Sequence, residues 1–388
     1  MIVYRTDQYD GFRCIAADCP YTCCARWNID VDEKTDRYYR TLDTEFGKLL
    51  NESIDRSPEG IRMKLDERGR CRMLSREGLC RVQAELGAEA LCRICKDFPR
   101  MAQTAGNFML WSTSAACPEA ARELLTHREP LRLLRAKAAP PEDARVPAFT
   151  EEDAARGPLL ERALQTSVRL LQDEKLDIGR RQRLFLLLHQ ALRETLRSDG
   201  TARTEALLAV FSDPAQYRGL LLGKDESPFE LAAKVRLFRE LCDILLTEEA
   251  TGLTATFFGY GLKRLTSIEN DARGQKKVRE YFARLDTGKH AREQENVLVD
   301  CLLKGYLGKA FDGDVYLQAA YVVVYNQLLR VFSALGSTEK LLSVNDRAIY
   351  LCAISRGFEH NGTAHERFQA KLRGDGLLEL PFLLRLIS

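Results

Sequence analysis

The cysteines of this 388-residue chain are concentrated near one end. Nine of the twelve lie in the first 117 residues, and they are Cys14, Cys19, Cys23, Cys24, Cys71, Cys80, Cys92, Cys95 and Cys117. In a reducing compartment thiols seldom persist as structural disulfides, so a dense group of them indicates metal binding or catalysis. The other three, Cys242, Cys301 and Cys352, are scattered through apolar helical pattern, where we expect ordinary buried cysteines.

The spacing of the nine cysteines predicts a soft-metal site. They come as Cys14-x4-Cys19-x3-Cys23-Cys24, then Cys71-x8-Cys80, then Cys92-x2-Cys95, then Cys117-Pro118. Closely spaced thiolates can supply two ligands from one turn of chain. The irregular spacing, the adjacent Cys23-Cys24 pair and the surplus over four thiols favour an iron–sulfur cluster, with four-cysteine zinc as the alternative.

Two familiar cysteine motifs are excluded. The first histidine is His127, so a mixed Cys/His zinc finger cannot form within the cysteine-rich segment. Cys19-x3-Cys23 resembles the start of the radical S-adenosylmethionine signature, but its third cysteine would fall at position 26, which is Arg26. Phe258-Gly259-Tyr260-Gly261 is also no dinucleotide or P-loop fingerprint, because no strand-turn-helix pattern surrounds it.

Charge and hydropathy exclude further classes. Lys plus Arg is 58 and Asp plus Glu is 56, so the chain lacks the net positive charge that nucleic-acid binding relies on, and we expect no nucleic-acid partner. The longest apolar stretch, 319–332, contains Asn326, Gln327 and Arg330 and is too short to span a bilayer. The first residues, MIVYRTDQYDGF, do not have the pattern of a signal peptide, so we expect a cytoplasmic protein without membrane association.

The patterning predicts a mainly α fold with two parts. We expect an irregular, cysteine-rich, metal-binding N-terminal domain over 1–137, a proline-rich linker over 138–157, and an all-helical bundle over 158–388, where leucines recur every three or four residues. Within the first part, 33–50 is helical in pattern, whereas 62–66 and 107–114 are typical of strands. Pro118 is expected in the first turn of a short helix.

Several motifs together resemble the flagellin lysine-N-methylase family. They are Phe12-x-Cys14, Cys19-x3-Cys23-Cys24-x2-Trp27-x-Ile29, Gly78-Leu79-Cys80-x-Val82-Gln83, Cys95-x2-Phe98-Pro99-Arg100 and Ala116-Cys117-Pro118-Glu119. The N-terminal block is also similar to the wider group of small cysteine-rich zinc- or iron-chelating domains. The resemblance is specific over about residues 10 to 125. Over the helical remainder it is general, and there the segment Ser355-Arg356-x2-Glu359-His360-Asn361 agrees.

The resemblance implies a protein-lysine N-methyltransferase that modifies flagellin with S-adenosylmethionine and contains a four-iron, four-sulfur cluster. The cluster ligands that it implies are Cys14, Cys19, Cys23, Cys24, Cys71, Cys80, Cys95 and Cys117, which are more than one cluster needs, so either two centres exist or about half of the thiols serve otherwise. Cys92 is dispensable to the family pattern. Thr22, Arg26 and Ala116 depart from that pattern, which puts the substrate in doubt more than the metal.

Other site residues are less defined by the sequence. Arg100 is our cofactor-binding candidate, because a guanidinium pairs with carboxylates or with a cluster's negative charge. His189 is expected in the helical core, His360 and His365 are equally compatible with surface and site, and no catalytic base can be assigned. We expect the aromatic residues Trp27, Phe98, Trp111 and Tyr260 to be core rather than pocket residues.

Two other function classes remain open. One is a non-catalytic protein-binding module stapled by a metal, and the other is a redox or metal-handling protein. Neither would transfer methyl groups to flagellin. The oligomeric state is not indicated by the sequence.

Overall fold

The computed structural model describes most of the chain. The described residues are 1–25, 27–105, 108–138, 150–197, 201–221, 231–246, 252–311, 314–337, 342–360, 362–374 and 376–387. Three features of the sequence analysis therefore lie outside them: Arg26, Asn361 and the stretch 139–149 of the predicted linker.

Two small sheets and several short helices make up the first third of the chain. In chain order the elements are β1 (Ile2–Thr6), α1 (Asp7–Gly11), α2 (Glu33–Arg40), α3 (Glu45–Glu52), β2 (Ile54–Ser57), β3 (Gly60–Met63), α4 (Arg81–Leu86), α5 (Arg93–Asp97), β4 (Arg100–Ala105), β5 (Phe108–Thr113), α6 (Pro118–Thr126) and β6 (Leu133–Lys137), with single 3-10 turns at Ala16–Asp18 and Ala88–Ala90. The expected helix over 33–50 is thus two helices. A strand forms over most of the predicted stretch 107–114, whereas β3 overlaps the predicted stretch 62–66 only at its first two residues. Pro118 opens α6.

The rest of the described chain is helical. Its helices are α7 (Glu151–Leu171), α8 (Ile178–Arg197), α9 (Thr201–Ser212), α10 (Pro214–Gly219), α11 (Leu231–Leu245), α12 (Gly252–Glu269), α13 (Ala272–Leu285), α14 (Gly288–Phe311), α15 (Val315–Ser337), α16 (Val344–Glu359), α17 (Gly362–Gly374) and α18 (Leu380–Ile387). The prediction of a mainly α fold is confirmed. None of the described helices has both the length and the apolar character of a membrane span.

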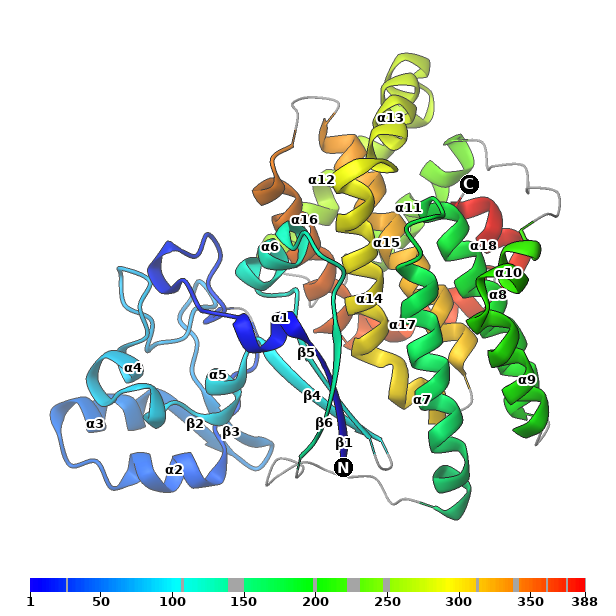
Figure 1. Ribbon diagram of the computed structural model, residues 1–388. Helices are drawn as coiled ribbons and strands as arrows, with labels where there is room; N and C mark the ends of the chain where they lie inside the picture. The colour runs from blue at the N-terminus through cyan, green and yellow to red at the C-terminus, as the bar shows by residue number, and fades with distance from the viewer. Residues whose placement is uncertain are drawn as a thin grey trace.

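A four-stranded mixed sheet, which the sequence analysis did not predict, lies between the two parts of the chain (Figure 1). Its strand order is β4-β5-β1-β6. The central pair, β1 and β5, is parallel with Tyr4 opposite Leu110, and β4 and β6 are antiparallel edge strands. Because β1 is only five residues long and its burial does not alternate, its partners more than a hundred residues away cannot be predicted from its own pattern.

Besides a small third cluster of Phe12, Cys117 and Ala120, the hydrophobic core of the described residues has two large bodies. The larger one joins the sheet to the helices, with Tyr4, Phe108 and Leu131 packed among leucines of the helical part. The smaller one belongs to the segment 24–98, which we call the cysteine-rich module; it centres on Ile29, Tyr39 and Met73 and includes the buried side chains of two cysteines. The module lies apart from the helices on the far side of the sheet (Figure 1). A hydrophobic core this small is usually stabilised by a further link, such as a bound metal.

The predicted domain boundaries remain predictions. α7 already begins at Glu151 and carries Pro158 within it, so helical structure starts inside the stretch read as a linker. The glycine-containing run at 258–261 lies within α12, where Gly261 allows the Phe332 ring of α15 to approach the backbone. This confirms that it is not a phosphate-binding loop.

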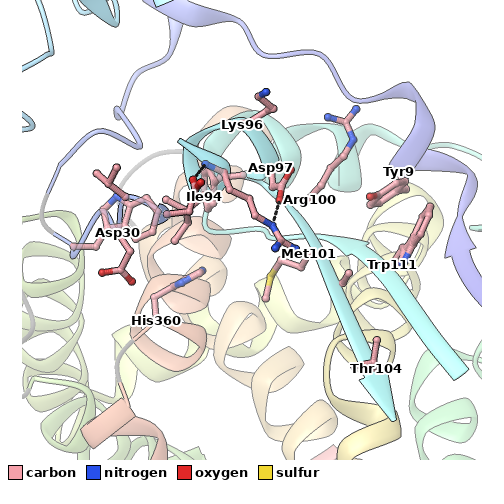
Figure 2. A pocket seen from close by; sticks show the side chains of 16 residues that line it. Tyr9, Asp30, Ile94, Lys96, Asp97, Arg100, Met101, Thr104, Trp111 and His360 are labelled. Carbon is pink, nitrogen blue, oxygen red and sulfur yellow. Dashed lines mark hydrogen bonds and ion pairs between the residues drawn. The ribbon is translucent and has the colours of Figure 1, made fainter. Parts of the chain in front are cut away.

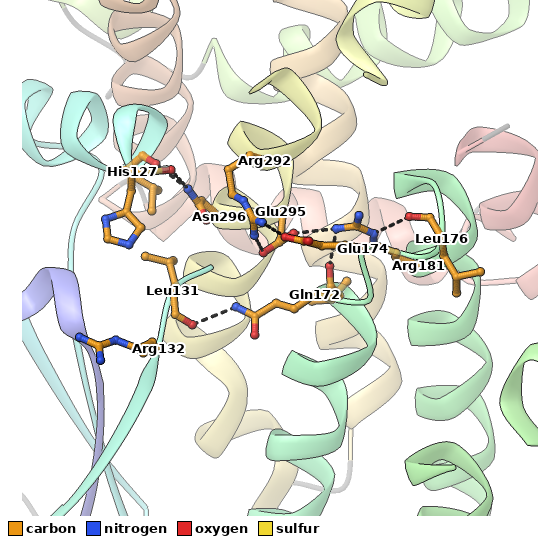
Figure 3. A network of polar contacts seen from close by, with 12 residues as sticks. His127, Leu131, Arg132, Gln172, Glu174, Leu176, Arg181, Arg292, Glu295 and Asn296 are labelled. Carbon is orange, nitrogen blue, oxygen red and sulfur yellow. Dashed lines mark hydrogen bonds and ion pairs between the residues drawn. The ribbon is translucent and has the colours of Figure 1, made fainter. Parts of the chain in front are cut away.

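A polar network fixes the central helix α14 to its surroundings (Figure 3). Arg181 of α8 pairs with Glu295 of α14 at 2.6 Å, and these side chains are only 7% and 1% exposed. Glu295 also pairs with Arg292. One residue further on, Asn296 donates to the carbonyls of Leu124 at 3.1 Å and His127 at 2.9 Å, which ties α14 to the end of α6.

Replacing Glu295 by alanine should lower the free energy of unfolding by about 3–5 kcal/mol, because the buried guanidinium of Arg181 would lose its counter-charge. Chemical denaturation measures the change. The matched control is Asp43→Ala, whose side chain is 94% exposed and should shift stability by less than about 0.5 kcal/mol. Equal effects of the two substitutions would contradict this account of the network.

Candidate active site

A large groove opens where the cysteine-rich module meets the sheet (Figure 2). Its volume is about 1110 Å³, which is ample for a small organic molecule together with a side chain of a protein substrate. One wall comes from the module and carries Trp27, Asp30, Asp32, Arg93, Asp97 and Phe98. The other comes from the sheet region, with Tyr9, Arg100 and Trp111, and His360 at the end of α16 completes it.

Aromatic rings line both walls of the groove. The Trp27 and Phe98 rings lie 5.9 Å apart on the module side, and the Tyr9 and Trp111 rings lie 5.6 Å apart on the sheet side. The expectation that Trp27, Phe98 and Trp111 are plain core residues is therefore wrong, because these side chains face the space between two separately packed bodies. Tyr260 is neither core nor part of the groove; it is 38% exposed on α12.

Arg100 is held at the sheet side of the groove. Its guanidinium lies 5.6 Å from the ring centre of Tyr9 and 5.5 Å from that of Phe12, and it donates to the Phe12 carbonyl at 3.2 Å. A stacked, half-buried guanidinium keeps its orientation and retains donors for an incoming carboxylate. The structure thus places Arg100 in the groove; its role in binding a cofactor is a proposal.

Three carboxylates face the groove from the module. Asp30 pairs with Arg62 at 3.1 Å, and Asp97 pairs with Arg93 at 3.4 Å. Asp32 caps α2 and accepts from the backbone NH groups of Thr35 and Arg93, both at 2.9 Å. Although partial burial raises the pKa of Asp32, these hydrogen bonds outweigh it and leave the pKa below its usual value. The module wall therefore presents carboxylates, two of them paired with arginines, beside its aromatic rings.

Behind His360 lies a buried chain of charged and polar groups. Lys304 of α14 pairs with Asp300 at 2.7 Å and with Glu359 at 3.2 Å, and none of the three side chains is more than 11% exposed. The Ser114 hydroxyl, just after β5, lies 3.1 Å from Glu359 Oε2 and 3.2 Å from His360 Nε2. Burial raises the pKa of Asp300 to about 6, although Lys304 opposes that shift.

His360 itself is accessible from the groove, with its ring edge toward Phe98 at 6.3 Å between ring centres. The protein atoms crowded around the ring nevertheless lower its pKa by desolvation, and the nearby Glu359 carboxylate only partly offsets this. Of the two uncertain histidines, His360 thus lies in the groove. His365 lies in α17 against Tyr321 and Gln369. His189 is fully buried, as expected, and desolvation lowers its pKa to about 4.

Four of the predicted metal-ligand cysteines form what we call the outer thiol set: Cys14, Cys19, Cys23 and Cys117. Burial raises the pKa of Cys117 to about 11, and the neighbouring Cys19 and Cys14 thiols add to the shift. The hydrogen bond with Cys24 and burial raise the pKa of Cys23, and the Cys117 and Cys14 thiols add to that shift. This set lies beside the groove, because the Trp27 indole donates to the Cys23 carbonyl at 2.5 Å.

The other predicted cysteine ligands belong to an inner thiol set, made of Cys24, Cys71, Cys80, Cys92 and Cys95. All five line one small cavity of about 20 Å³ inside the module. Burial raises the pKa of Cys71 to about 12, with Cys24, Cys80 and Cys92 as charge neighbours. Cys92, which the motif analysis set aside, is hydrogen-bonded to the Cys95 thiol in this set, and that hydrogen bond lowers the pKa of Cys92. A hydrogen bond between Cys23 and Cys24 is the link between the two sets.

The chemistry of both sets fits a soft metal, since each brings several thiols together. No group of three or more His, Cys, Asp or Glu side chains in the described parts of the chain is arranged to hold a metal ion. The crowded thiols, however, are mostly driven toward their neutral forms by desolvation and by one another. A bound cation is the usual means by which such a group becomes thiolate.

The three C-terminal cysteines are buried in the helical core, as expected. Cys352 has a further contact: its thiol donates to the Ala116 carbonyl at 3.1 Å, and Arg356 Nε donates to the same oxygen at 3.0 Å. α16 thereby holds the turn that carries Ser114 and Cys117.

Sequence reasoning missed the groups behind His360. Lys304, Asp300 and Ser114 belong to unremarkable helical or strand patterns, and their meeting depends on the packing of α14, α16 and β5. The sequence contains one weak sign of these groups, which is a pair of opposite charges within an apolar segment. Asp300 and Lys304 are four residues apart and so lie on one face of a helix.

Residues 165–386 match the model of the FliB lysine N-methylase C-terminal domain. The match spans more than half of the chain, and the chain belongs to the FliB lysine N-methylase family. No solved structure matches it.

Similar curated proteins come from Salmonella. Two, each named Lysine-N-methylase, from Salmonella typhimurium and Salmonella choleraesuis, are 33% identical over 128 residues, which is 31% of this chain and 32% of theirs. The Flagellar biosynthetic protein FliU of Salmonella muenchen is 32% identical over 128 residues, covering 31% of this chain and 76% of that protein. The similarity thus spans about a third of the length of the first two relatives.

The stability of the protein should depend on pH through Asp300. Its pKa in the folded state, about 6, lies above the usual value of 3.8, so the folded state holds a proton that the unfolded state has lost. The stabilisation is full below about pH 4 and is lost as the pH rises through 6. In Asp300→Asn this loss should disappear, so the melting temperature of the variant should rise relative to the native protein between pH 4.5 and 7. Asp43→Asn is the surface control, and a difference that does not vary with pH would contradict the assignment.

Proposed function

We propose that this chain is a protein-lysine N-methyltransferase that uses S-adenosylmethionine to methylate flagellin, and that the groove is where the methyl group is transferred. The observation that carries the proposal is the composition of the groove walls. Both substrates of this reaction are cations at the reacting ends, a sulfonium and an ammonium. Aromatic faces next to carboxylates are the surroundings that bind such groups.

The family supports the reaction, and the name of one relative supports the substrate. The matched model is that of a lysine N-methylase, and the Salmonella muenchen relative is named as a flagellar biosynthetic protein. A flagellin lysine is therefore the amine that we propose for the groove.

The direct test is transfer of a labelled methyl group from S-adenosylmethionine to flagellin, followed by mass spectrometry of the lysines. We expect methylated lysine with the native protein. Two side chains of the facing module and sheet walls, Trp27 and Trp111, should each be needed for full activity, since each supplies a ring to the groove. Absence of any methyl transfer by metal-loaded native protein would overturn the proposal.

Arg100 is proposed to pair with the carboxylate of the methyl donor. Arg100→Ala should weaken S-adenosylmethionine binding by about 10- to 100-fold, the worth of a charge-assisted hydrogen bond. Isothermal titration gives the dissociation constant. Arg76→Ala, an exposed arginine that does not line the groove, is the control and should bind normally. Unchanged affinity in Arg100→Ala would remove Arg100 from the binding site.

The thiols are proposed to hold metal as two centres, with an iron–sulfur cluster in the outer thiol set. Cys14 and Cys23 of that set are exposed, and the set adjoins the groove through Trp27. The inner cavity, in contrast, is about 20 Å³, roughly the space of one water molecule. It suits a single soft ion such as Zn²⁺, whereas a four-iron cluster would have to displace the surrounding side chains.

Metal and sulfide analysis of anaerobically prepared protein tests this division. The double variant Cys14→Ser/Cys117→Ser should lose iron and sulfide but keep the inner ion, while Cys71→Ser/Cys80→Ser should lose the inner ion. Cys242→Ser, in the helical core, is the control and should keep both. If both double variants lose the same metal in the same proportion, the thiols form one centre and the division is wrong.

A further inference from the structure

Methylation of lysine requires that the substrate amine first lose a proton. An ordinary lysine has a pKa of about 10.4, so only about one molecule in 2,500 is neutral at pH 7. Desolvation and the positive charge of the methyl donor lower that pKa in a closed site. A proton acceptor within the groove is still needed to take the proton from the substrate ammonium.

The carboxylates and the tyrosine of the groove are poor acceptors. Asp30 and Asp97 are paired with arginines, and both oxygens of Asp32 already accept hydrogen bonds, two of them from Thr35. Burial raises the pKa of Tyr9, so its hydroxyl keeps its proton at neutral pH. Among the described side chains that line the groove, His360 is the remaining base, and the groove has no other histidine.

The contacts of His360 define which nitrogen is available. The Glu359 carboxylate, paired with Lys304, can only accept, so the single proton of the Ser114 hydroxyl goes to Glu359 Oε2 at 3.1 Å. Ser114 Oγ then accepts from the His360 Nε2–H at 3.2 Å. The lone pair of the neutral ring is therefore on Nδ1.

We propose that His360 is the catalytic residue that accepts the proton of the substrate ammonium, and that Ser114 and Glu359 are positioning residues that orient its ring. This inference rests on the proposed function. The proton moves from the substrate Nζ to Nδ1 of His360, and the nitrogen lone pair then attacks the methyl carbon. The carbon–sulfur bond breaks with its electron pair on sulfur, giving a thioether and a methylated ammonium, and His360 returns its proton to water.

The charges around His360 suit this role. From its own helix Glu359 favours the protonated ring and Arg356 opposes it, and Lys304 of α14 opposes it too. Across the groove stand the paired carboxylates and the cations Arg93, Lys96 and Arg100. Desolvation, together with Lys304 and Arg356, lowers the pKa of the His360 ring, so the ring is neutral at pH 7 and can accept a proton.

The kinetic test compares His360→Asn with the native protein. We expect kcat at pH 7 to fall by about 100-fold or more, with little change in KM. The logarithm of kcat for the variant should then rise steadily with pH, since hydroxide takes over the removal of the proton. Imidazole should restore part of the activity to His360→Ala. Ser114→Ala should lower kcat and leave KM for flagellin unchanged. His365→Asn, outside the groove, is the control and should behave as native.

A second measurement does not depend on turnover. The chain has five histidines, so ring nitrogen-15 resonances can be assigned with single variants. A lysine-containing flagellin peptide should shift the His360 resonances and leave those of His365 unmoved.

The outcomes separate the two proposals. Full activity and a native pH profile in His360→Asn, or an unmoved His360 signal in an active protein that binds the peptide, would overturn the role of His360 alone. A native protein that transfers no methyl group would overturn the proposed function and this inference with it.

Discussion

The pairing of Lys304 with Asp300 and Glu359 is the interaction on which the arrangement of the site depends. A buried ammonium between two carboxylates is stable only if all three groups stay in contact, since removing any one of them leaves an unpaired charge in a low-dielectric setting. The carboxylates of Asp300 and Glu359 accordingly raise the pKa of Lys304 against the opposing effect of burial. The contact between Lys304 of α14 and Glu359 of α16 therefore fixes the position of α14 against α16.

Two parts of the site follow from the position of α16. Its last residue, Glu359, orients Ser114 at the end of β5, and Cys352 and Arg356 bind the Ala116 carbonyl. The end of α16 therefore places His360 in the groove. Its contacts with Ser114 and Ala116 also hold the turn before α6, which carries Cys117 of the outer thiol set. The groove itself exists because the cysteine-rich module has a core of its own and docks on the sheet rather than merging with the helices.

The sequence was informative where its signals are local. Leucine periodicity predicted the helices, Pro118 predicted the start of α6, and the clustered thiols predicted which segment would be unusual. The thiols separate into two sets in the structure, and Cys23 and Cys24, adjacent in the chain, belong to different sets. The sheet was not predictable in the same way, because β1 pairs with β5 and β6 across more than a hundred residues. The groove-facing role of Trp27, Phe98 and Trp111 was misread for a related reason: an aromatic side chain in a short segment has the same pattern in a core and in a groove between two cores.

The central claim is that the groove between module and sheet is the site of methyl transfer, and photochemical cross-linking of radiolabelled S-adenosylmethionine tests it most directly. After ultraviolet irradiation and proteolysis, the label should lie on peptides containing Tyr9, Trp27, Phe98 or Trp111, and excess unlabelled compound should abolish it. Label confined to the smaller cavity of about 490 Å³ near Tyr21 and Tyr350, or to the helical body, would contradict the account.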